Sequence, residues 1–162
     1  MESKDALQTL LHSFERYYTV KTDGVVAPFS AEAEFHSHTE QFFLVRAAHI
    51  ADIDSNEFVF FAEEGQLTSA RLTELDAAAW QEGLSRVRPC AGHRNSDVTL
   101  IVLADKIDDD AFRQIKRLKH SKSYKFTLHG WSNFRALAYE VSSGRVTYNR
   151  FGKDLKKLVG SL

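Results

Sequence analysis

The chain has 162 residues, of which 43% are hydrophobic and 12% aromatic, and its formal net charge is −1. This length and apolar content predict one globular domain over residues 1–162 and argue against a disordered chain. The apolar runs are too short for a helix that spans a bilayer, so no membrane partner is expected. The charged N-terminus lacks a signal peptide, and Cys90, the lone cysteine, cannot form an intramolecular disulfide. We therefore expect a soluble, cytoplasmic protein.

The near-zero net charge hides a strong asymmetry along the chain. Residues 1–110 carry 9 Lys and Arg against 20 Asp and Glu, a balance of −11. Residues 111–162 carry 12 Lys and Arg against 2 Asp and Glu, a balance of +10. No linker separates the two parts, so the asymmetry belongs to one folded unit. It predicts either separate patches on one surface, with an anionic partner for the basic one, or neutralisation of the two parts against each other.

The N-terminal residues have the pattern of an amphipathic helix. Apolar side chains at three- and four-residue spacing predict this helix over residues 3–20, and the turn residues 21–24 end it. Residues 25–29 form a short extended piece, which Pro28 restricts to a sheet edge.

The next elements are strand-like. Residues 31–50 and 57–62 are rich in apolar and aromatic side chains, and residues 52–56 between them have the composition of a turn. These features predict an antiparallel hairpin that ends at 63–65. Residues 66–71 are a candidate for a third short strand.

A helix, a buried strand and another helix follow. Thr73 is the expected N-cap of the first helix, and Pro89 ends it. The almost continuous apolar run at 97–105 predicts a central strand buried on both faces. Residues 108–110 are acidic and open a helix over 111–120, whose basic end matches the helix dipole.

The C-terminal part predicts three strands and a short helix. The strands are 124–128, 133–142 and 145–150, and the turn 142–144 makes the last two a hairpin. A basic helix starts at Lys153. The whole order of elements predicts an α+β fold, with a mixed, mostly antiparallel sheet, two hairpins and three to four helices.

The first candidate for chemistry is the histidine-rich run Glu34-Phe35-His36-Ser37-His38-Thr39-Glu40. Within a strand, its four ligand-type side chains would share one face at ~7 Å spacing, which suits a divalent metal ion and a small metal-dependent enzyme. The run resembles the His-x-His element of cupin metal sites, but the flanking glycines are missing and the acid follows too early. The alternative is a solvated polar face of an exposed strand. The four residues are Glu34, His36, His38 and Glu40.

Two other patterns are weaker candidates for a catalytic site. Cys90 and His93 could form a thiolate–imidazole pair, but no third group is evident to orient them, so an incidental cysteine beside a loop histidine is favoured. Asp54 and Glu57 suggest the acids of a restriction-type nuclease. No lysine stands two residues after Glu57, so a nuclease site is not expected.

The basic C-terminal residues form the second main candidate. Lys and Arg neutralise phosphates, and aromatic residues interleaved with them can stack on bases, so a nucleic acid or another polyanion is a possible partner. The alternative is a basic helix face that pairs with the acidic part, with the aromatics in the core. The residues predicted to bind an anion are Lys116, Arg117, Lys122, Lys125, Asn149, Arg150 and Lys153.

The C-terminal run also resembles a known family. Its features are the Gly130-Trp131 opening, a hairpin, and the ending Asn149-Arg150-Phe151-Gly152-Lys153. These features resemble an uncharacterised prokaryotic domain family, and the strand from Glu34 to Leu44 is similar to that family's first long strand. The resemblance covers most of residues 10–158. It implies one compact domain and no particular activity.

The Asn-Arg-x-Gly-Lys ending has two physical interpretations. Asn149, Arg150 and Lys153 could present three donors to an anion at a helix start. In the alternative, Asn149 satisfies backbone groups in a strand-to-helix turn, and Gly152 allows that turn.

Three functions remain open from the sequence. The leading hypothesis is a non-catalytic binding or regulatory domain that meets an anionic partner through its basic C-terminal surface. The first alternative is the metal-dependent enzyme described above, and the second is a self-associating structural domain. No other cofactor is indicated, and the sequence does not decide whether the protein is an enzyme.

Overall fold

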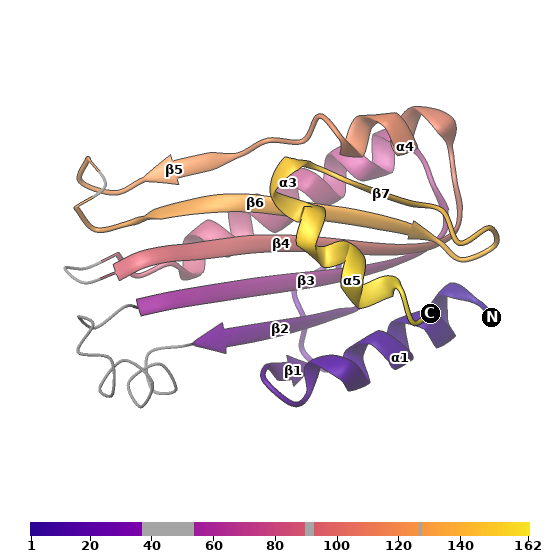
Figure 1. Cartoon of the computed structure of the whole chain (residues 1–162), viewed down its shortest axis with the longest axis horizontal. Coiled ribbons are helices and arrows are strands. Elements are labelled where there is room, and N and C mark those ends of the chain that lie inside the picture. Colours follow the sequence, from indigo (N-terminus) through magenta and orange to yellow (C-terminus); the bar gives the residue numbers. More distant parts are fainter. Residues whose placement is uncertain (37–53, 90–92, 127) are drawn as a thin grey trace.

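The computed structural model describes residues 1–36, 54–89, 93–126 and 128–162. Within these ranges the chain forms an open seven-stranded mixed sheet with helices on both faces (Figure 1). The strand order is β1-β2-β3-β4-β6-β5, and β7 pairs with the same edge of β6 as β5 does, further along that strand. The predicted α+β fold with a mixed sheet is therefore confirmed.

The elements have the following bounds. The helices are α1 (Ser3–Phe14), α3 (Ser69–Arg86), α4 (Asp109–Ile115) and α5 (Lys156–Val159), and the 3-10 helix η1 (Arg150–Leu155) leads into α5. The strands are β1 (Thr19–Lys21), β2 (Ala31–His36), β3 (Asp54–Leu67), β4 (His93–Ile107), β5 (Ser121–Ser123), β6 (Trp131–Glu140) and β7 (Val146–Tyr148). No helix in the described part of the chain is long and apolar enough to cross a membrane.

The centre of the sheet is parallel. β4 lies between β3 and β6 and runs parallel to both, which confirms the predicted central strand. α3 and α4 are the helices on the connections between these parallel strands. Antiparallel neighbours flank the centre: β1 and β2 on the β3 side, and β5 and β7 on the β6 side.

Two predicted boundaries in the middle of the chain are wrong. β3 continues through the supposed turn at 63–65 as far as Leu67, because its ladder with β4 pairs Gln66 with Lys106. No strand forms at 66–71, because α3 begins at Ser69. Its N-cap is Thr68, whose side chain accepts a hydrogen bond from the Arg71 amide (3.1 Å), so the cap lies five residues before the predicted one.

Three other predicted elements are shorter or shifted. α1 ends at Phe14, and the last two residues of the predicted helix, together with Lys21 of the predicted turn, pair with β2 as β1. α4 ends at Ile115. The predicted strand at 124–128 is replaced by β5 and a turn in which Lys125 and Phe126 have positive φ angles of 46° and 54°. The hairpin turn at 142–144 is confirmed, with the Gly144 amide bonded to the Glu140 carbonyl (2.8 Å).

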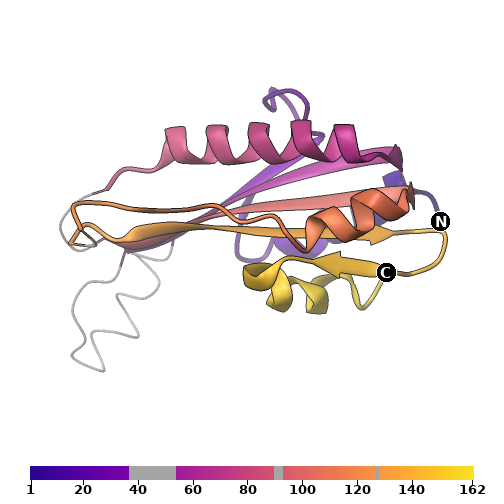
Figure 2. The same cartoon turned by 90° about the horizontal axis from the view of Figure 1, so that it is seen from above.

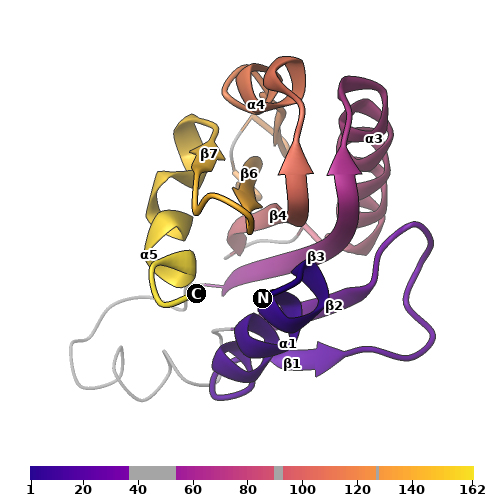
Figure 3. The ribbon, with the colours of Figure 1, turned by 90° about the vertical axis from the view of Figure 1, so that its right-hand side faces the viewer.

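Both faces of the central strands are covered. In β4, even-numbered residues such as Leu100 pack under α3 and α4, and odd-numbered residues such as Ile101 pack under α1, η1 and α5. Figure 2 shows α3 above the sheet and the η1–α5 segment below it, and Figure 3 shows the same division end-on. Near the amino ends of the central strands, the α1 side of the sheet changes from apolar to polar residues.

Glu140, at the end of β6, makes the stability of the folded protein depend on pH. Its carboxylate accepts the Ile107 amide (2.7 Å) and pairs with Arg145 (2.9 Å). The Arg145 guanidinium lowers the pKa of Glu140 to about 2 from its usual 4.5. A carboxyl whose pKa is lower in the folded state stabilises that state above its unfolded pKa, and this stabilisation is lost as pH falls.

We therefore expect wild-type protein to lose about 1–2 kcal/mol of unfolding free energy between pH 4.5 and 2 that Glu140→Gln does not lose. The expected loss is smaller than the full pKa shift implies, because Arg145 is 45% exposed and solvent screens the pair. Urea unfolding of wild type and Glu140→Gln at several pH values across this range measures the difference in unfolding free energy. Parallel pH profiles of the two proteins would contradict the prediction.

Candidate functional site

The basic C-terminal residues gather beside β7. Lys116 at the end of α4, and Arg150 and Lys153 in η1, line one hollow of about 520 Å³ together with β7 itself. We call this hollow the basic groove; its lining residues are Lys116, Val146, Thr147, Tyr148, Asn149, Arg150 and Lys153. The three cations come from segments more than thirty residues apart, and all three side chains are exposed. Four of the seven residues predicted to bind an anion therefore lie in one place.

Asn149 lies in the basic groove but its side chain is occupied. Its amide oxygen accepts the Ala136 and Gly152 amides at 3.0 and 2.9 Å. Its nitrogen donates to the carbonyls of Leu118 and Phe134 at 3.0 and 2.9 Å. This is the strand-to-helix turn anticipated as the alternative, so Asn149 shapes the groove and offers no free donor to an anion.

Glycine is required at position 152 of the same turn because two backbone segments approach each other closely there. A Cβ on this residue would lie 2.4 Å from the Ala136 carbonyl oxygen and 2.8 Å from the Asn149 amide oxygen. The close approach places the start of η1 against β6. It thereby positions Arg150 and Lys153 beside β7.

Among the described residues, no ion pair joins a cation of the basic groove to the acidic part. Within the described ranges, the ion pairs that join residues 111–162 to residues 1–110 are Arg113–Asp110, His120–Asp76 and Arg135–Glu57. Lys116 and Arg150 instead lie over the rings of Phe112 and Phe151, both at 5.9 Å. The ion pairs that join the two parts within the described ranges therefore involve Arg113, His120 and Arg135 and none of the groove cations.

The other residues predicted to bind an anion lie outside the groove lining. Arg117 follows α4, and Lys122 lies in β5 with its amine 5.6 Å from the centre of the Tyr124 ring. Lys125 lies in the turn before β6. All three side chains are exposed, but none of them lines the groove.

The predicted metal site falls partly outside the described residues. His38 and Glu40 lie there, as does Cys90, so the candidate Cys90–His93 pair, which the sequence did not favour, also falls outside the described residues. Glu34 and His36 share one face of β2 as expected, with a carboxylate–imidazole distance of 3.2 Å. The other Glu34 oxygen accepts from Arg86 (3.1 Å), and the other His36 nitrogen contacts Asn56 (2.7 Å). Among the described residues, no group of three or more His, Cys, Asp or Glu side chains is placed to hold a metal ion.

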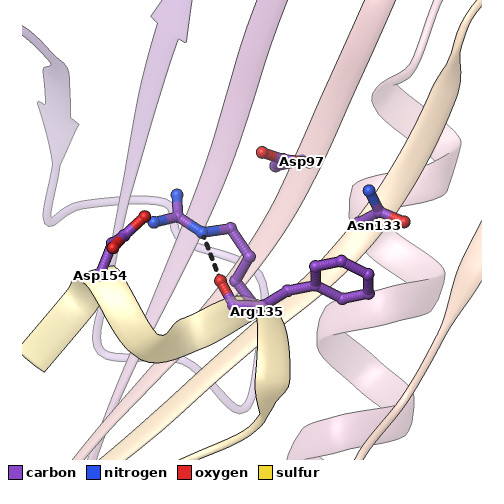
Figure 4. Close-up of a pocket in the computed structure, with 5 residues that line it drawn as sticks. Asp97, Asn133, Arg135 and Asp154 are labelled. Carbon is purple, nitrogen blue, oxygen red and sulfur yellow. Dashed lines mark hydrogen bonds between the residues drawn. The ribbon is translucent and has the colours of Figure 1, made fainter.

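A second hollow lies on the opposite side of β6 from α3. It measures about 350 Å³ and is lined by Asp97, Asn133, Arg135, Phe151 and Asp154 (Figure 4). We call it the polar hollow. The ladder between β4 and β6 places Asp97 beside Asn133 and Thr99 beside Arg135. Figure 4 shows the Arg135 guanidinium between η1 and the sheet, with Asp154 turned toward it.

The buried carboxylate of Glu57 holds the Arg135 guanidinium in place. Glu57 is only 9% exposed and is bonded to the Arg135 guanidinium, the Tyr18 hydroxyl and the Thr99 hydroxyl, the last at 2.6 Å. The Arg135 Nε also donates to the Phe151 carbonyl (3.2 Å). The segment after α1, three strands and η1 thus meet at one ion pair. Two of the five N–H groups of Arg135 are used in these bonds, and no other described residue is recorded as accepting from the rest.

Burial perturbs two acids in this region. It raises the pKa of Asp97, while bonds to Asn95 and the charge of Arg135 act in the opposite direction. Burial also raises the pKa of Tyr18, reinforced by the adjacent Glu57 carboxylate. Asp97 lines the polar hollow, and a perturbed acid in a hollow is typical of binding and catalytic sites, although structural ion pairs produce such acids as well.

Sequence reasoning missed the polar hollow. Asp97 lies on β4, whereas Asn133 and Arg135 lie on β6, so the register between these two strands brings them together. The alternation of side chains between the two faces of β4 and β6 contained a signal for this site. Asp97 and Arg135 are polar residues at positions where the strand continues with inward-facing apolar side chains, such as Ile101 and Leu137.

The described residues thus form an open α+β sheet with a basic groove along one edge strand and a polar hollow on one face. A family model for a domain of unknown function, DUF8052, matches residues 2–160, and the chain belongs to that family. The expected membership of an uncharacterised family is confirmed. No curated protein and no solved structure matches the chain.

Proposed function

We propose that this protein is a non-catalytic binding domain that recognises an anionic partner through the basic groove. The observation that carries the proposal is the convergence of Lys116, Arg150 and Lys153 on one hollow. Their charges have no ion-pair partner within the described residues. Exposed, uncompensated cations attract anions over distances of about a Debye length and raise association rates.

The rigidity of the groove supports the proposal. Arg150 and Lys153 follow a turn that Asn149 holds with four hydrogen bonds to backbone groups. Lys116 follows α4, which is tied to β7 by the bond from Thr147 to the Phe112 carbonyl (2.9 Å). Cations held at a fixed spacing lose less conformational freedom when they bind, and this favours affinity.

Charge reversal in the groove is expected to abolish most of the binding. We expect Lys116→Glu/Arg150→Glu/Lys153→Glu to bind inorganic polyphosphate about a hundredfold more weakly than wild type. The slope of log Kd against log salt should also fall by roughly 2–3, because fewer counterions are displaced. Titrations at several salt concentrations, followed by fluorescence anisotropy of labelled polyphosphate, measure both quantities.

A matched control carries the same change in net charge elsewhere. Lys4→Glu/Arg16→Glu/Lys106→Glu alters three exposed cations that lie outside the groove. It should keep at least a third of the wild-type affinity. Equal losses in both triple variants would mean that only net charge matters, and the groove would not be the site.

The polar hollow favours a second candidate function, the binding of a small zwitterion such as a free amino acid. Arg135 retains donors for a carboxylate, and Asp97 and Asp154 offer acceptors to an ammonium group. The volume of about 350 Å³ lies within the range of small-molecule sites. The carboxylate of a zwitterion would meet Arg135, and its ammonium group would meet Asp97 and Asp154.

Simple probes test the second candidate. Alanine should shift the amide resonance of Asn133 at lower concentration than ethylamine or propionate, each of which has only one of its charged groups. Asp97→Asn should weaken alanine binding about tenfold, whereas Asp105→Asn, which changes a carboxylate outside the hollow, should not. Equal binding of ethylamine and alanine would exclude a zwitterion site.

A further inference from the structure

The outer edge of β7 has backbone groups without partners in the described part of the chain. In the β6–β7 ladder, Thr147 pairs with Ala138. The neighbouring contacts set which pairs are bonded: the Glu140 amide donates to the Arg145 carbonyl (2.8 Å), and the Asn149 amide donates to the Ala136 carbonyl (3.0 Å). Bonded and non-bonded pairs alternate along an antiparallel ladder, so Thr147 bonds inward to β6.

Val146 and Tyr148 therefore direct their backbone N–H and C=O groups away from β6. No described residue donates to or accepts from these groups. β5 does not cover them, because it pairs with the other end of β6, at Trp131–Asn133. Both residues are part of the lining of the basic groove, so the unpaired edge of β7 lies beside the three cations.

We propose that the basic groove takes an extended acidic peptide segment, which adds to the sheet as a strand beside β7. This inference rests on the proposed function and specifies its partner. A peptide strand supplies both donors and acceptors to Val146 and Tyr148, which a phosphate chain cannot do, because its groups only accept. Strand addition at an exposed edge is a common mode of peptide recognition.

The arrangement of the cations determines which side chains the peptide carries. The core contacts place α4 on the α3 face of the sheet and η1 on the α1 face; Lys116 follows α4, whereas Arg150 and Lys153 belong to η1. Successive side chains of a strand point to opposite faces. A run of consecutive acidic residues would therefore meet a cation on each side, whereas a peptide with acids at alternate positions would use only one side.

The edge is too short to bind a strand by itself. β7 has three residues, and only two of them direct backbone groups outward. Short edge strands with neighbouring positive charges resist uncontrolled pairing between chains. Selectivity for an acidic segment follows, because hydrogen bonds to two residues require the additional attraction of the flanking cations.

Hydrogen exchange of the whole chain tests the proposal directly. A short, blocked glutamate peptide should slow exchange of the Val146 and Tyr148 amides at least about tenfold, while Thr147, already bonded to β6, should change less. Inorganic polyphosphate should bind without this protection. The glutamate peptide N-methylated at alternate residues should bind about tenfold more weakly, because net hydrogen bonds worth about one decade in affinity are lost.

A protein variant provides a second measurement. Val146→Pro removes one outward N–H group and leaves the inward bonds of Thr147 in place, and proline is tolerated where the N–H of an edge strand faces solvent. It should weaken binding of the glutamate peptide several-fold and leave polyphosphate binding unchanged. Equal loss for both probes would contradict strand addition.

The remaining outcomes separate the two proposals. Peptide binding that perturbs Lys116 and Arg150 without protecting Val146 and Tyr148 would overturn strand addition but support the basic groove. Absence of binding by both peptide and polyphosphate would overturn the groove and strand addition together. Protection of the two amides that rises with protein concentration alone would identify a second copy as the occupant and contradict the peptide.

Discussion

Replacing Asn149 by alanine should destabilise the protein by about 3–4 kcal/mol. The side chain is 1% exposed and bonds the Ala136 amide and the carbonyls of Leu118 and Phe134. Alanine leaves a buried donor, a buried acceptor and the part-buried Leu118 carbonyl without partners, and an unsatisfied buried group costs about 1–3 kcal/mol. The Gly152 amide loses less, since it also contacts the Asn149 carbonyl (3.1 Å).

The same residue distinguishes a structural role from an anion-binding role. Arg150→Ala and Lys153→Ala change exposed side chains in the same groove and should alter unfolding free energy by no more than about 0.5 kcal/mol. Urea unfolding with similar m-values compares the three variants. If Asn149→Ala proves as stable as Arg150→Ala, the hydrogen-bond network at this turn is not what holds η1 against β6.

The sequence predicts the central elements of this fold because their signals are local. The apolar run at 97–105 predicts a central strand, and β4 has parallel neighbours on both sides. The turn chemistry of 142–144 predicts the β6–β7 hairpin. In both cases the residues that form the element also carry its pattern, so no long-range contact is needed to recognise it.

The errors arise where tertiary contacts override local composition. Glu63-Glu64-Gly65 has the composition of a turn, yet the β4 ladder continues alongside and keeps these residues in β3. Glu64 is stabilised there by Arg71, which donates to its carboxylate at 2.7 Å. Position 64 becomes a strand residue through a partner on α3 that the local pattern does not reveal.

The candidate site residues also divide into some that the local sequence reveals and others that depend on tertiary contacts. Lys116, Arg150 and Lys153 stand out in the sequence because they belong to a basic segment, although which of the basic residues meet depends on the packing of α4 against β7. The acids and the arginine of the polar hollow do not stand out. Glu57 and Arg135 are separated by 78 residues, and their contact depends on the register of three strands.

The ion pair between Glu57 and Arg135 should contribute the other large effect on stability. Glu57→Ala leaves a guanidinium that is only 20% exposed without its carboxylate, and it also removes the acceptor of the Tyr18 and Thr99 hydroxyls. Removing one partner of a buried ion pair costs about 3–5 kcal/mol. We expect a loss in this range by urea unfolding at neutral pH.

A double-mutant cycle assigns that loss to the pair. Arg135→Met alone should also destabilise the protein, because it leaves Glu57 buried with only the two hydroxyls. In Glu57→Ala/Arg135→Met neither charge remains, so the double variant should be less destabilised than the sum of the single variants by about 1–3 kcal/mol. Strictly additive losses would mean that the two side chains stabilise the fold independently. The meeting point of β3, β4, β6 and η1 would then depend on apolar packing, and the ion pair would serve to orient Arg135 toward the polar hollow without supporting the fold.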